Sequence, residues 1–477
     1  PAIGEQIAEV ELASKTTVEK AIESSSKAFL KWSKTTPISR SRILSKYKDL
    51  LIKNMEQLAV MVSEQHGKTI ADAKGSIQRG IEVVEYATGI TDSLKGDHST
   101  SVGTNVDSHT LRQPLGVCAG ITPFNFPAMV PMWMYPVSIA CGNTFVLKPS
   151  EKDPSCPMRL AELAIEAGLP AGVLNVVNGD KEAVDTLLEN KTVQAISFVG
   201  STPIAEYVYH TGTKNNKRVQ ALGGAKNHMV IMPDADLDKV SDNLIGASFG
   251  AAGERCMSIS VAVPVGEKTG DNLKEILLSK IQKLKVGPFN SNEKIDFGPL
   301  ISLQAKNRVS KIIKNAQKEG AELLIDGSNI NINGYENGFY IGPTLFDRVK
   351  LETELYKEEV FGPVLSIVRA ENISEAKQIL INNKYGNGAA IYTNNGEVAR
   401  SFVREVNIGM IGINIPIPVP LAFYTFGGWK KSAFGDLNQH GPDSVKFYTK
   451  TKTVTAKWQK KINEEINFSL PTSENFD

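Results

Sequence analysis

The sequence has little cysteine and little histidine. Four cysteines and six histidines occur among 477 residues, and no two cysteines form a Cys-x-x-Cys pair. No histidine stands at metal-ligand spacing from a cysteine, so the sequence predicts neither a disulfide framework nor a metal site. This cysteine usage favours a reducing compartment, which would be the cytoplasm of a bacterium or the mitochondrial matrix of a eukaryote.

Long apolar runs and an excess of one charge are also absent. No uninterrupted run approaches the roughly 18 residues of a membrane-spanning helix, so we expect no membrane partner. Lys and Arg number 53 and Asp and Glu number 52, a balance that argues against a nucleic-acid partner. The chain begins at Pro1 without an apolar signal core, which gives secretion no support but leaves a cleaved targeting segment open.

The composition is that of a large globular protein. Hydrophobic residues make up 41% and charged residues 22% of the chain. A prior of about 150 residues per domain predicts two or three domains. The first 90 residues show helical spacing, for example from Ile43 to Leu51. A polar stretch at 99–112 predicts an exposed hairpin that is a candidate for pairing with another subunit. Residues 446–458 alternate like a strand, but the sequence shows no partner for it.

Between 114 and 224, short β-branched runs alternate with amphipathic helices. This alternation predicts a parallel sheet with crossover helices, an architecture typical of nucleotide-binding domains. The predicted strands lie at 116–122, 144–148, 173–177 and 195–200. A second α/β block spans about 228–426. Its predicted strands lie at 229–232, 259–265, 364–368 and 389–392, with helices near 270–285 and 303–319.

Cys256 is the candidate nucleophile. It follows a small, flexible Ala-Ala-Gly stretch and a Glu-Arg pair, so its backbone can come close to a ligand. A thiolate is a good nucleophile toward a carbonyl carbon, and the thioester that forms is an activated acyl group. The alternative is that Cys256 is a small buried side chain, which is how we interpret Cys118, Cys141 and Cys156.

Three other motifs stand where strands of the first block end. Asn125 lies in a Pro-bounded turn, where its amide could donate to an oxyanion or only satisfy the turn backbone. Lys148 and Glu151 stand at the C-terminal edge of a strand, which is where open α/β sheets bind cofactors. Gly200 and Ser201 open a helix, and helix N-terminal amides suit a pyrophosphate, although the motif is neither Gly-x-Gly-x-x-Gly nor a P-loop.

These motifs, in this order, resemble the aldehyde dehydrogenase superfamily along the whole chain. The resemblance rests on the Pro-Phe-Asn turn, Lys-Pro-Ser-Glu, Phe-x-Gly-Ser-Thr, Leu-Gly-Gly, Gly-x-x-Cys, KEEVFGPVL (357–365) and FGGWKKSAFG (426–435). Four segments are most similar to the CoA-acylating branch that includes the methylmalonate-semialdehyde dehydrogenases: WMYPVSIACGNTFVLKPSE (133–151), ALGGAKNHMVIMPDADLD (221–238), GAAGERCMS (250–258) and INIPIPVPLAF (413–423). The resemblance implies an α/β fold with a Rossmann-type cofactor domain, an α/β catalytic domain and a small β oligomerisation element.

The resemblance also implies domain boundaries and an assembly. Residues 1–97 and 114–224 would form the NAD-binding domain, 225–426 the catalytic domain, and 98–113 with 445–477 the oligomerisation element. NAD would be the cofactor and CoA a co-substrate, and the subunits would assemble into a homo-oligomer, a dimer of dimers.

By motif position, the resemblance implies roles for individual residues. Cys256 would be the nucleophile, and Asn125 with the Cys256 backbone N–H would form the oxyanion hole. Lys148 and Glu151 would bind the adenosine ribose, and Ser201 the pyrophosphate. The nicotinamide end would be held by Glu359, with Phe361 flanking the ring. The other cofactor-binding residues would be Thr122, Phe124, Lys152, Gly200 and Gly223.

Ala221 departs from the hydrolytic members, which carry a glutamate immediately before Leu-Gly-Gly. Without that carboxylate, water should attack the thioester slowly. A thiol such as CoA, with a free thiol pKa of about 8.5, is already partly ionised and needs no base. Ala221 therefore favours acyl transfer over hydrolysis. Ala205 replaces a second glycine at the helix start and is small enough to leave the phosphate site possible.

Arg79 and Arg255 are candidates for binding a substrate carboxylate. Arg255 precedes the nucleophile, and Arg79 lies on a helix that matches the one bordering the family's substrate tunnel. A buried guanidinium without a partner is costly, so a tunnel-facing pair expects an anion, which a 3-oxo acid supplies. The alternatives are that Arg79 pairs with Glu82 or Glu85, and that Arg255 faces solvent or pairs with Glu254.

Three functions remain open from the sequence. The first is CoA-dependent oxidative decarboxylation of malonate or methylmalonate semialdehyde to acetyl-CoA or propionyl-CoA with NAD, as in valine or inositol catabolism. The second is hydrolytic oxidation to a free acid with another base, for instance Glu254 or Glu359. The third is a non-catalytic binding protein on the same scaffold, against which the intact Cys256, Asn125 and Glu359 argue.

Overall fold

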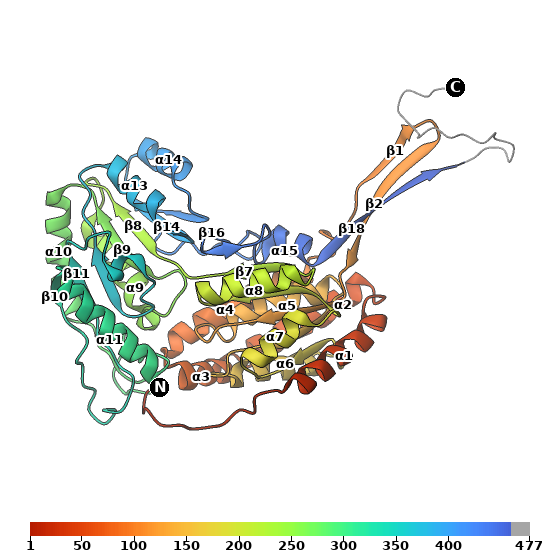
Figure 1. Ribbon diagram of the computed structural model, residues 1–477, viewed down its shortest axis with the longest axis horizontal. Helices are drawn as coiled ribbons and strands as arrows, with labels where there is room; N and C mark the ends of the chain where they lie inside the picture. The colour runs from red at the N-terminus through yellow and green to blue at the C-terminus, as the bar shows by residue number, and fades with distance from the viewer. Residues whose placement is uncertain (459–477) are drawn as a thin grey trace.

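The computed structural model describes residues 1–458, whose larger sheets number three (Figure 1). A seven-stranded sheet lies at one end of the molecule and a six-stranded sheet in the middle. A three-stranded arm projects from the six-stranded half, on the side away from the seven-stranded sheet. Part of the predicted oligomerisation element, 459–477, lies outside the described residues.

Four helices precede the first sheet, as the spacing of apolar residues predicts. Three of them begin at a side chain that accepts a hydrogen bond from a backbone N–H of the first turn: Ser14, Thr36 and Thr69. Such caps satisfy backbone donors that a helix leaves free at its start. The helices are α1 (Lys15–Trp32), α2 (Pro37–Lys53), α3 (Met55–His66) and α4 (Ile70–Thr88).

The six-stranded sheet has the order β17-β7-β6-β3-β4-β5, in which β3 to β7 run parallel and β17 pairs antiparallel with β7. The first strand in sequence, β3, lies in the middle, and the chain winds outward from it in both directions. The four strands predicted between 116 and 200 are confirmed. The bounds are β3 (Val117–Ile121), β4 (Thr144–Lys148), β5 (Leu174–Val176), β6 (Val193–Val199), β7 (Arg218–Leu222) and β17 (Ala433–Phe434).

Helices α5 (Met129–Ala140), α6 (Ser155–Glu166), α7 (Lys181–Glu189) and α8 (Thr202–Lys214) connect these strands. Helix α5 is buried along its whole length because it packs between α4 and strands β3 and β4. Its residues Trp133 and Tyr135 are among the largest fully buried side chains of the chain. Two apolar clusters therefore form around this sheet, the larger one joining α2 to α6 and reaching Tyr448.

The seven-stranded sheet has the order β10-β11-β12-β9-β8-β14-β15 and is parallel except for β10. Its own apolar cluster fills both faces. The strands are β8 (Asn227–Ile231), β9 (Ile259–Pro264), β10 (Glu322–Ile325), β11 (Thr344–Asp347), β12 (Val364–Ile367), β14 (Gly388–Tyr392) and β15 (Met410–Ile413). The helices of this half are α9 (Leu237–Phe249), η1 (Gly250–Gly253), α10 (Glu267–Ile281), α11 (Leu303–Lys318), α12 (Glu354–Lys357), α13 (Ile373–Asn382) and α14 (Gly396–Glu405). A two-stranded sheet, β13 (Tyr385–Gly386) with β16 (Trp429–Lys430), and helix α15 (Gly441–Phe447) complete the chain.

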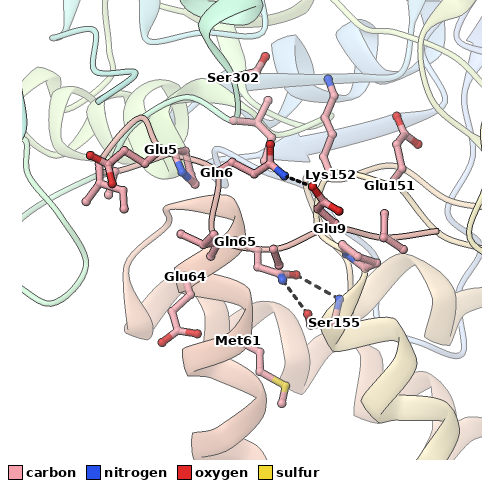
Figure 2. A pocket seen from close by; sticks show the side chains of 18 of the residues that line it. Glu5, Gln6, Glu9, Met61, Glu64, Gln65, Glu151, Lys152, Ser155 and Ser302 are labelled. Carbon is pink, nitrogen blue, oxygen red and sulfur yellow. Dashed lines mark hydrogen bonds between the residues drawn. The ribbon is translucent and has the colours of Figure 1, made fainter. Parts of the chain in front are cut away.

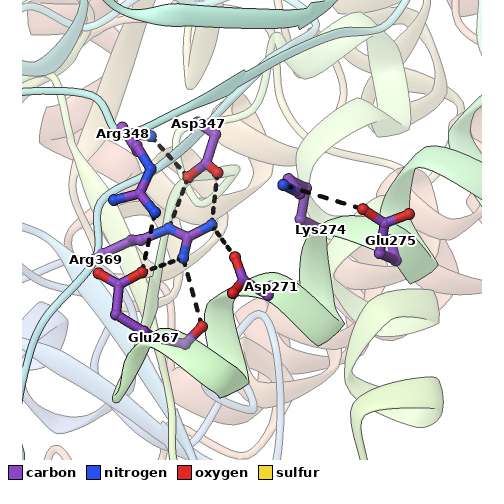
Figure 3. Close-up of polar contacts among 7 residues, drawn as sticks. All are labelled: Glu267, Asp271, Lys274, Glu275, Asp347, Arg348 and Arg369. Atoms are coloured by element: carbon purple, nitrogen blue, oxygen red, sulfur yellow. Dashed lines mark hydrogen bonds and ion pairs between the residues drawn. The ribbon is translucent and has the colours of Figure 1, made fainter.

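A cluster of charged side chains joins α10 to the ends of β11 and β12 (Figure 3). The guanidinium of Arg369 holds the carboxylate of Asp347 with two hydrogen bonds, Nε–Oδ1 at 3.2 Å and Nη2–Oδ2 at 2.7 Å. Asp347 is fully buried, and Arg369 also reaches Glu267 and Asp271 on α10. These ion pairs raise the pKa of Arg369 above its ordinary value, so the cluster ties a surface helix to the sheet by charge.

The arm corrects one expectation. The tail strand is not without a partner, because β18 (Thr449–Lys457) pairs antiparallel with β2 (Val106–Pro114) along nine residues. Strand β1 (His98–Gly103) pairs with the other edge of β2, as the predicted hairpin requires. The sequence could not reveal the β2–β18 pairing because antiparallel partners distant in the chain leave no local pattern.

Residues 1–458 contain neither a membrane-spanning helix nor a cluster of metal ligands. None of the helices there combines the length and the apolar character that crossing a bilayer demands. In the same residues, no three His, Cys, Asp or Glu side chains come together as metal ligands would.

Candidate active site

Cys256 lies where the two large sheets face one another. It occupies a turn directly before β9, and it is only partly buried, whereas Cys118, Cys141 and Cys156 are fully buried. The alternative interpretation as a small core residue therefore fits those three and not Cys256. The backbone carbonyl of Cys256 accepts hydrogen bonds from the side-chain amides of Asn227, at 2.9 Å, and Asn387, at 3.0 Å. Asn227 on β8 and Asn387, directly before the neighbouring strand β14, thus fix the main chain of the nucleophile.

The turn before Cys256 has an unusual backbone. Ala251, Ala252 and Gly253 all have positive φ, at 51°, 52° and 74°. For alanine this left-handed region is unfavourable by roughly 1 kcal/mol per residue, and such outliers cluster at functional sites. Gly253 is required here, because a Cβ on it would come within 2.2 Å of the Gly362 carbonyl oxygen. The turn thus lets the chain reverse sharply after α9 and place Cys256 between the sheets.

Asn125 lies in the loop after β3 and reaches the chain beside Cys256. Its side chain is buried, and its Nδ2 donates to the backbone carbonyl of Glu254 at 3.0 Å. Because β3 and β6 are neighbours from which the chain winds in opposite directions, the loops at their carboxyl ends enclose a crevice, the usual ligand site of such sheets. Asn125 and Ser201 follow these two strands. The amide that the sequence predicts as an oxyanion donor is therefore in reach of the nucleophile turn.

A cavity of about 380 Å³ extends from Cys256 over this crevice. It brings together eight of the predicted site residues: Phe124, Asn125, Gly200, Ser201, Gly223, Cys256, Glu359 and Phe361. Its dimensions suit an extended small molecule with a polar end. The sequence therefore predicted most of one real cavity from motifs that are up to 240 residues apart, without any of the distances.

The phosphate end of the cavity is formed by the start of α8. Ser201 is the N-cap residue, yet its hydroxyl makes no capping hydrogen bond and Ser201, Thr202 and Pro203 all line the cavity. A Cβ at Gly200 would lie 2.5 Å from the Phe198 ring, and one at Gly223 would lie 2.8 Å from the Lys431 carbonyl oxygen. A helix start without a side-chain cap and a backbone bare of side chains at Gly200 and Gly223 suit a pyrophosphate. The residues present therefore fit a dinucleotide.

The same cavity is also lined by Glu359 and by the rings of Phe124 and Phe361. Phe361 also has a positive φ of 50°, and its ring meets that of Phe124 edge to face at 6.0 Å. One carboxylate oxygen of Glu359 accepts from the Ala225 N–H at 2.9 Å. Burial raises the pKa of Glu359 to about 7. The carboxyl group can thus accept a ribose hydroxyl while exchanging a proton near neutral pH.

Two cations that the sequence analysis missed hold the Glu359 segment in place. Lys226 is buried and donates to the carbonyls of Leu355, at 2.6 Å, and Glu358, at 2.9 Å. Burial lowers the pKa of Lys226 to about 7. Arg308 on α11 donates to the carbonyl of Glu359 at 3.2 Å from the other side. Lys226 stands two residues after the Leu-Gly-Gly motif, and this position was the signal that could have identified it.

The remaining predicted cofactor residues do not line the Cys256 cavity. Lys148, at the end of β4, is buried and pairs with Glu151 at 3.1 Å. Glu151 and Lys152 instead line a larger cavity of about 820 Å³ beside the N-terminal segment, shown in Figure 2. Lys152 connects the two cavities because its Nζ lies 5.3 Å from the centre of the Phe124 ring. Thr122 is buried behind them, and its Oγ1 has no hydrogen-bond partner among the described residues.

A second, smaller cavity opens on the other side of Cys256. It measures about 170 Å³, and most of its wall is apolar: Phe126, Met129, Trp133, Met257, Ile417, Val419 and Phe426. Its charged members are Arg79, Arg255 and Asp72. The two arginines, predicted from the sequence to lie together, therefore do line one cavity with the nucleophile. Its volume suits an aldehyde of few carbon atoms with an anionic group.

Each arginine is already paired with a carboxylate. Arg79 Nη1 contacts Glu82 Oε2 at 2.6 Å, one of the predicted alternatives, and Nη2 donates to the carbonyl of Pro420. Arg255 pairs with Asp72 at 2.9 Å. The alternative that Arg255 pairs with Glu254 is wrong. The Glu254 carboxyl instead accepts from the Ile301 N–H at 3.3 Å and lies 3.7 Å from His66 Nε2. Asp72 was missed, since nothing local in the sequence marks a partner so far along the chain.

The ionisable groups differ sharply in their state. Burial, together with the nearby Glu359, raises the pKa of the Cys256 thiol to about 12, so the resting thiol is protonated. Burial raises the pKa of Glu254 to about 8. Glu254 lines neither of the two cavities described at Cys256, whereas Glu359 lines the one of about 380 Å³. Of the two alternative bases, only Glu359 is therefore placed to act near the nucleophile.

Ala221 lies in β7, between Phe198 of β6 and Phe434 of β17 in register. Its side chain is fully buried in the apolar cluster of this sheet. The Ala221 side chain is therefore surrounded by apolar groups and is not exposed to solvent.

Comparison with known proteins agrees with this geometry. Residues 1–454 match the aldehyde dehydrogenase family model. A malonate-semialdehyde dehydrogenase from Pseudomonas aeruginosa is 53% identical over 99% of this chain and 95% of its own length. Another from Halalkalibacterium halodurans is 47% identical over 96% and 94%. The crystal structure of a methylmalonate-semialdehyde dehydrogenase from Oceanimonas doudoroffii has a TM-score of 0.96 at 52% identity, covering 97% of this chain and 94% of that one.

A second solved structure carries the cofactor. It comes from Sinorhizobium meliloti, is assigned as a methylmalonate-semialdehyde dehydrogenase and is complexed with NAD. Its TM-score is 0.96 at 55% identity, over 97% of this chain and 94% of that one. The predicted α/β aldehyde dehydrogenase-like fold is thereby confirmed. Because both the family model and close relatives extend over nearly the whole length, this chain belongs to the aldehyde dehydrogenase family.

Proposed function

We propose that the chain is an NAD-dependent, CoA-acylating semialdehyde dehydrogenase. It converts malonate or methylmalonate semialdehyde into acetyl-CoA or propionyl-CoA with loss of CO2. The observation that carries the proposal is the position of Cys256 between two cavities. One fits a dinucleotide and the other combines apolar walls with two arginines. Relatives at 47–53% identity bear the name malonate-semialdehyde dehydrogenase, which supports the substrate class.

The residues divide the work of oxidation. NAD supplies the hydride acceptor when it is bound in the cavity of about 380 Å³ beside Cys256. The Cys256 sulfur adds to the aldehyde carbon as its S–H proton passes to the carboxylate of Glu359, which lines the same cavity, because the resting thiol is protonated. The Asn125 amide and the Cys256 backbone N–H donate to the oxyanion that results. Loss of hydride from this adduct leaves the acyl group on Cys256 as a thioester.

Decarboxylation follows from the position of the substrate carboxylate. That group is beta to the thioester carbonyl, so the C–C electron pair can pass into the carbonyl as CO2 departs. The enolate that forms is stabilised by the same oxyanion donors and takes up a proton at carbon. Arg79 and Arg255 bind the carboxylate beforehand, which places it for this step. The CoA thiolate then attacks the thioester and releases Cys256.

The adenosine end supports NAD rather than NADP. Glu151, held by Lys148 at 3.1 Å, presents a carboxylate that accepts ribose hydroxyls and repels a 2′-phosphate. Lys152 nearby weakens this repulsion. The arm, with its two open edges, supports assembly of a homo-oligomer, a dimer of dimers. We also propose that the enzyme takes part in valine or inositol catabolism.

Measuring NADH formation with excess malonate semialdehyde, with and without CoA, tests the proposal. We expect one equivalent of NADH per site without CoA and sustained turnover only with it. Sustained turnover without CoA would instead establish the hydrolytic function, for which Glu359 is the remaining base. Absence of any NADH would leave a non-catalytic protein on this scaffold.

A further inference from the structure

Lys68 is a buried cation that none of the steps above uses. It lies between α3 and α4, directly after Gly67, which has a φ of 96°, and its side chain is 1% exposed. An ammonium group withdrawn from water loses its hydration, so partners of good geometry must compensate for it. What those partners are decides what Lys68 can do.

The nearest partner is the oxyanion loop itself. Lys68 Nζ donates to the backbone carbonyl of Asn125 at 2.7 Å. The same ammonium lies 4.2 Å from the centre of the Phe126 ring, which is the geometry of a cation–π contact. Two consecutive residues of the loop after β3 are therefore fixed by one side chain from a different part of the chain.

Asn125 is thus held at both ends. Lys68 binds its main chain, and the side-chain amide reaches the backbone carbonyl of Glu254, two residues before Cys256. A donor to an oxyanion is effective only when it is held in place before the charge develops. We infer that Lys68 is a positioning residue that sets the Asn125 amide against Cys256. This role rests on the proposed function of the site.

A structural role as a counter-ion is the competing explanation. Asp72, Asp153 and the Glu254 carboxyl surround Lys68, together with the Arg255 guanidinium and the His66 imidazole, whose pKa burial holds well below its ordinary value. Burial raises the pKa of Asp153 and raises that of Glu254 to about 8, so burial favours the uncharged form of both carboxyl groups and weakens their need for a cation. Asp72 already has Arg255 as its partner. The hydrogen bond to Asn125 is therefore the contact that most requires Lys68.

Two substitutions of similar length separate the explanations. Lys68→Met removes both the charge and the donor, whereas Lys68→Gln removes the charge and keeps an N–H donor. If Lys68 positions Asn125, Lys68→Met should lower kcat about 10- to 100-fold with the KM for NAD changed less than about twofold, since the oxyanion forms after binding. Lys68→Gln should retain at least about fivefold more kcat than Lys68→Met. Equal losses in both variants would overturn the inference.

A double-mutant cycle provides the second criterion. Asn125→Ala alone should cost about 100- to 1000-fold in kcat, as removal of an oxyanion donor does elsewhere. With Asn125 absent there is nothing left to position, so adding Lys68→Met should lower kcat by less than about threefold. The same 10- to 100-fold loss in both backgrounds would mean that Lys68 acts elsewhere.

Two further measurements keep the result decisive. If Lys68→Met does not fold, Lys68→Arg keeps the charge but replaces the ammonium by a longer, planar group; unchanged kcat would then overturn the positioning role. Wild-type protein that forms no NADH would refute the proposed function alone. In that event, crystal structures of the Met and Gln variants test the inference directly, because an unmoved Asn125 in Lys68→Met contradicts it.

Discussion

Arg79 and Arg255 line the cavity of about 170 Å³ beside Cys256, and each is already paired with a carboxylate, Glu82 and Asp72 respectively. The free protein therefore does not bury an unpaired guanidinium, and a substrate carboxylate joins an existing ion pair instead of creating one. Glu82 is 30% exposed and Asp72 17% exposed. Water can thus take over solvation of Glu82 more readily than of Asp72 if the arginine is removed.

This asymmetry gives the first prediction. Arg79→Leu and Arg255→Leu should each lower kcat/KM for malonate semialdehyde by the equivalent of about 2–5 kcal/mol. The loss should be greater for Arg255→Leu, which leaves Asp72 facing the substrate anion. Steady-state kinetics with propanal, which has no carboxylate, provides the control and should change little. Equal losses on both aldehydes would show that the arginines support the fold and not the substrate.

Glu254 gives a prediction about pH. Its folded-state pKa of about 8 lies above the ordinary 4.5, so the protonated form is favoured in the native protein. The stability that it contributes is complete below pH 4.5 and is lost as pH rises through 8. Glu254→Gln should remove this dependence and be more stable than wild type at pH 9, by on the order of 2–4 kcal/mol, but not at pH 5.

Urea unfolding at pH 5, 7 and 9 measures this difference. Glu162→Gln serves as the control, because that carboxylate is 58% exposed in a surface ion pair with Arg159 and should have a small effect at every pH. Parallel pH profiles of Glu254→Gln and wild type would contradict the expectation.

Single residues also show where prediction from the sequence succeeds. Cys256, Asn125 and Glu359 stand in motifs whose chemistry can be recognised before any fold is known. Lys68 stands in the loop before α4 and Asp72 in the first turn of that helix, where charged residues are usually solvated. Only the tertiary structure reveals that both are withdrawn from water. Buried ion pairs between distant segments have no signature in the chain itself.

Among the structural elements, the turn Ala251–Gly253 determines where the nucleophile stands. Because Ala252 has a φ of 52°, glycine suits the position and a β-branched residue does not. Ala252→Gly should leave kcat within about twofold and change stability by less than about 1 kcal/mol, since relief of strain offsets the added freedom of the unfolded chain. Ala252→Val should lower kcat at least tenfold and destabilise the protein by about 2 kcal/mol. Turnover and thermal unfolding of both variants check this, and an active Ala252→Val would show that the turn tolerates movement.

The Arg369 cluster gives a prediction for the packing of α10 on its sheet. Arg369→Met should destabilise the protein by about 3–5 kcal/mol, because it leaves the fully buried Asp347 carboxylate without its cation. Arg348→Met is the matched control: its guanidinium is 55% exposed and pairs with Glu267, so about 1 kcal/mol or less is expected. Denaturant unfolding separates the two, and a loss of similar size in both would mean that burial of Asp347 is not the cause.

On the scale of the whole molecule, the arm of β1, β2 and β18 is the element with the least to hold it to its own subunit. Val102 and Leu111 on it are 46% and 44% exposed. Replacing both with lysine should dissociate the assembly, which sedimentation or light scattering would detect as a smaller particle. Leu30→Lys on α1, where the side chain is 67% exposed, provides the control. A wild-type protein that is already monomeric would refute the role of the arm.

The general architecture was accessible from the sequence because its strands are mostly parallel. Parallel strands are buried on both faces and alternate with helices, and both patterns are local in the chain. The strands that escaped prediction, such as β10, β15 and β17, lie at sheet edges and have only two to four residues, which is too short to show a period. Helical and parallel segments carry their own pattern, whereas edges and long-range pairs depend on the rest of the molecule.

The apolar surroundings of Ala221 set the timing of the whole cycle. Since no water is activated there, an acylated subunit must wait until a thiol arrives, and it cannot accept another aldehyde in the meantime. Under the proposed function the protein therefore depends on two supplies, the semialdehyde and free CoA: it stops oxidising when free CoA is scarce, and it keeps the acyl group while it waits. Under the proposed function, the methyl group of Ala221 in the middle of a strand thus makes the rate of NADH formation depend on the concentration of free CoA.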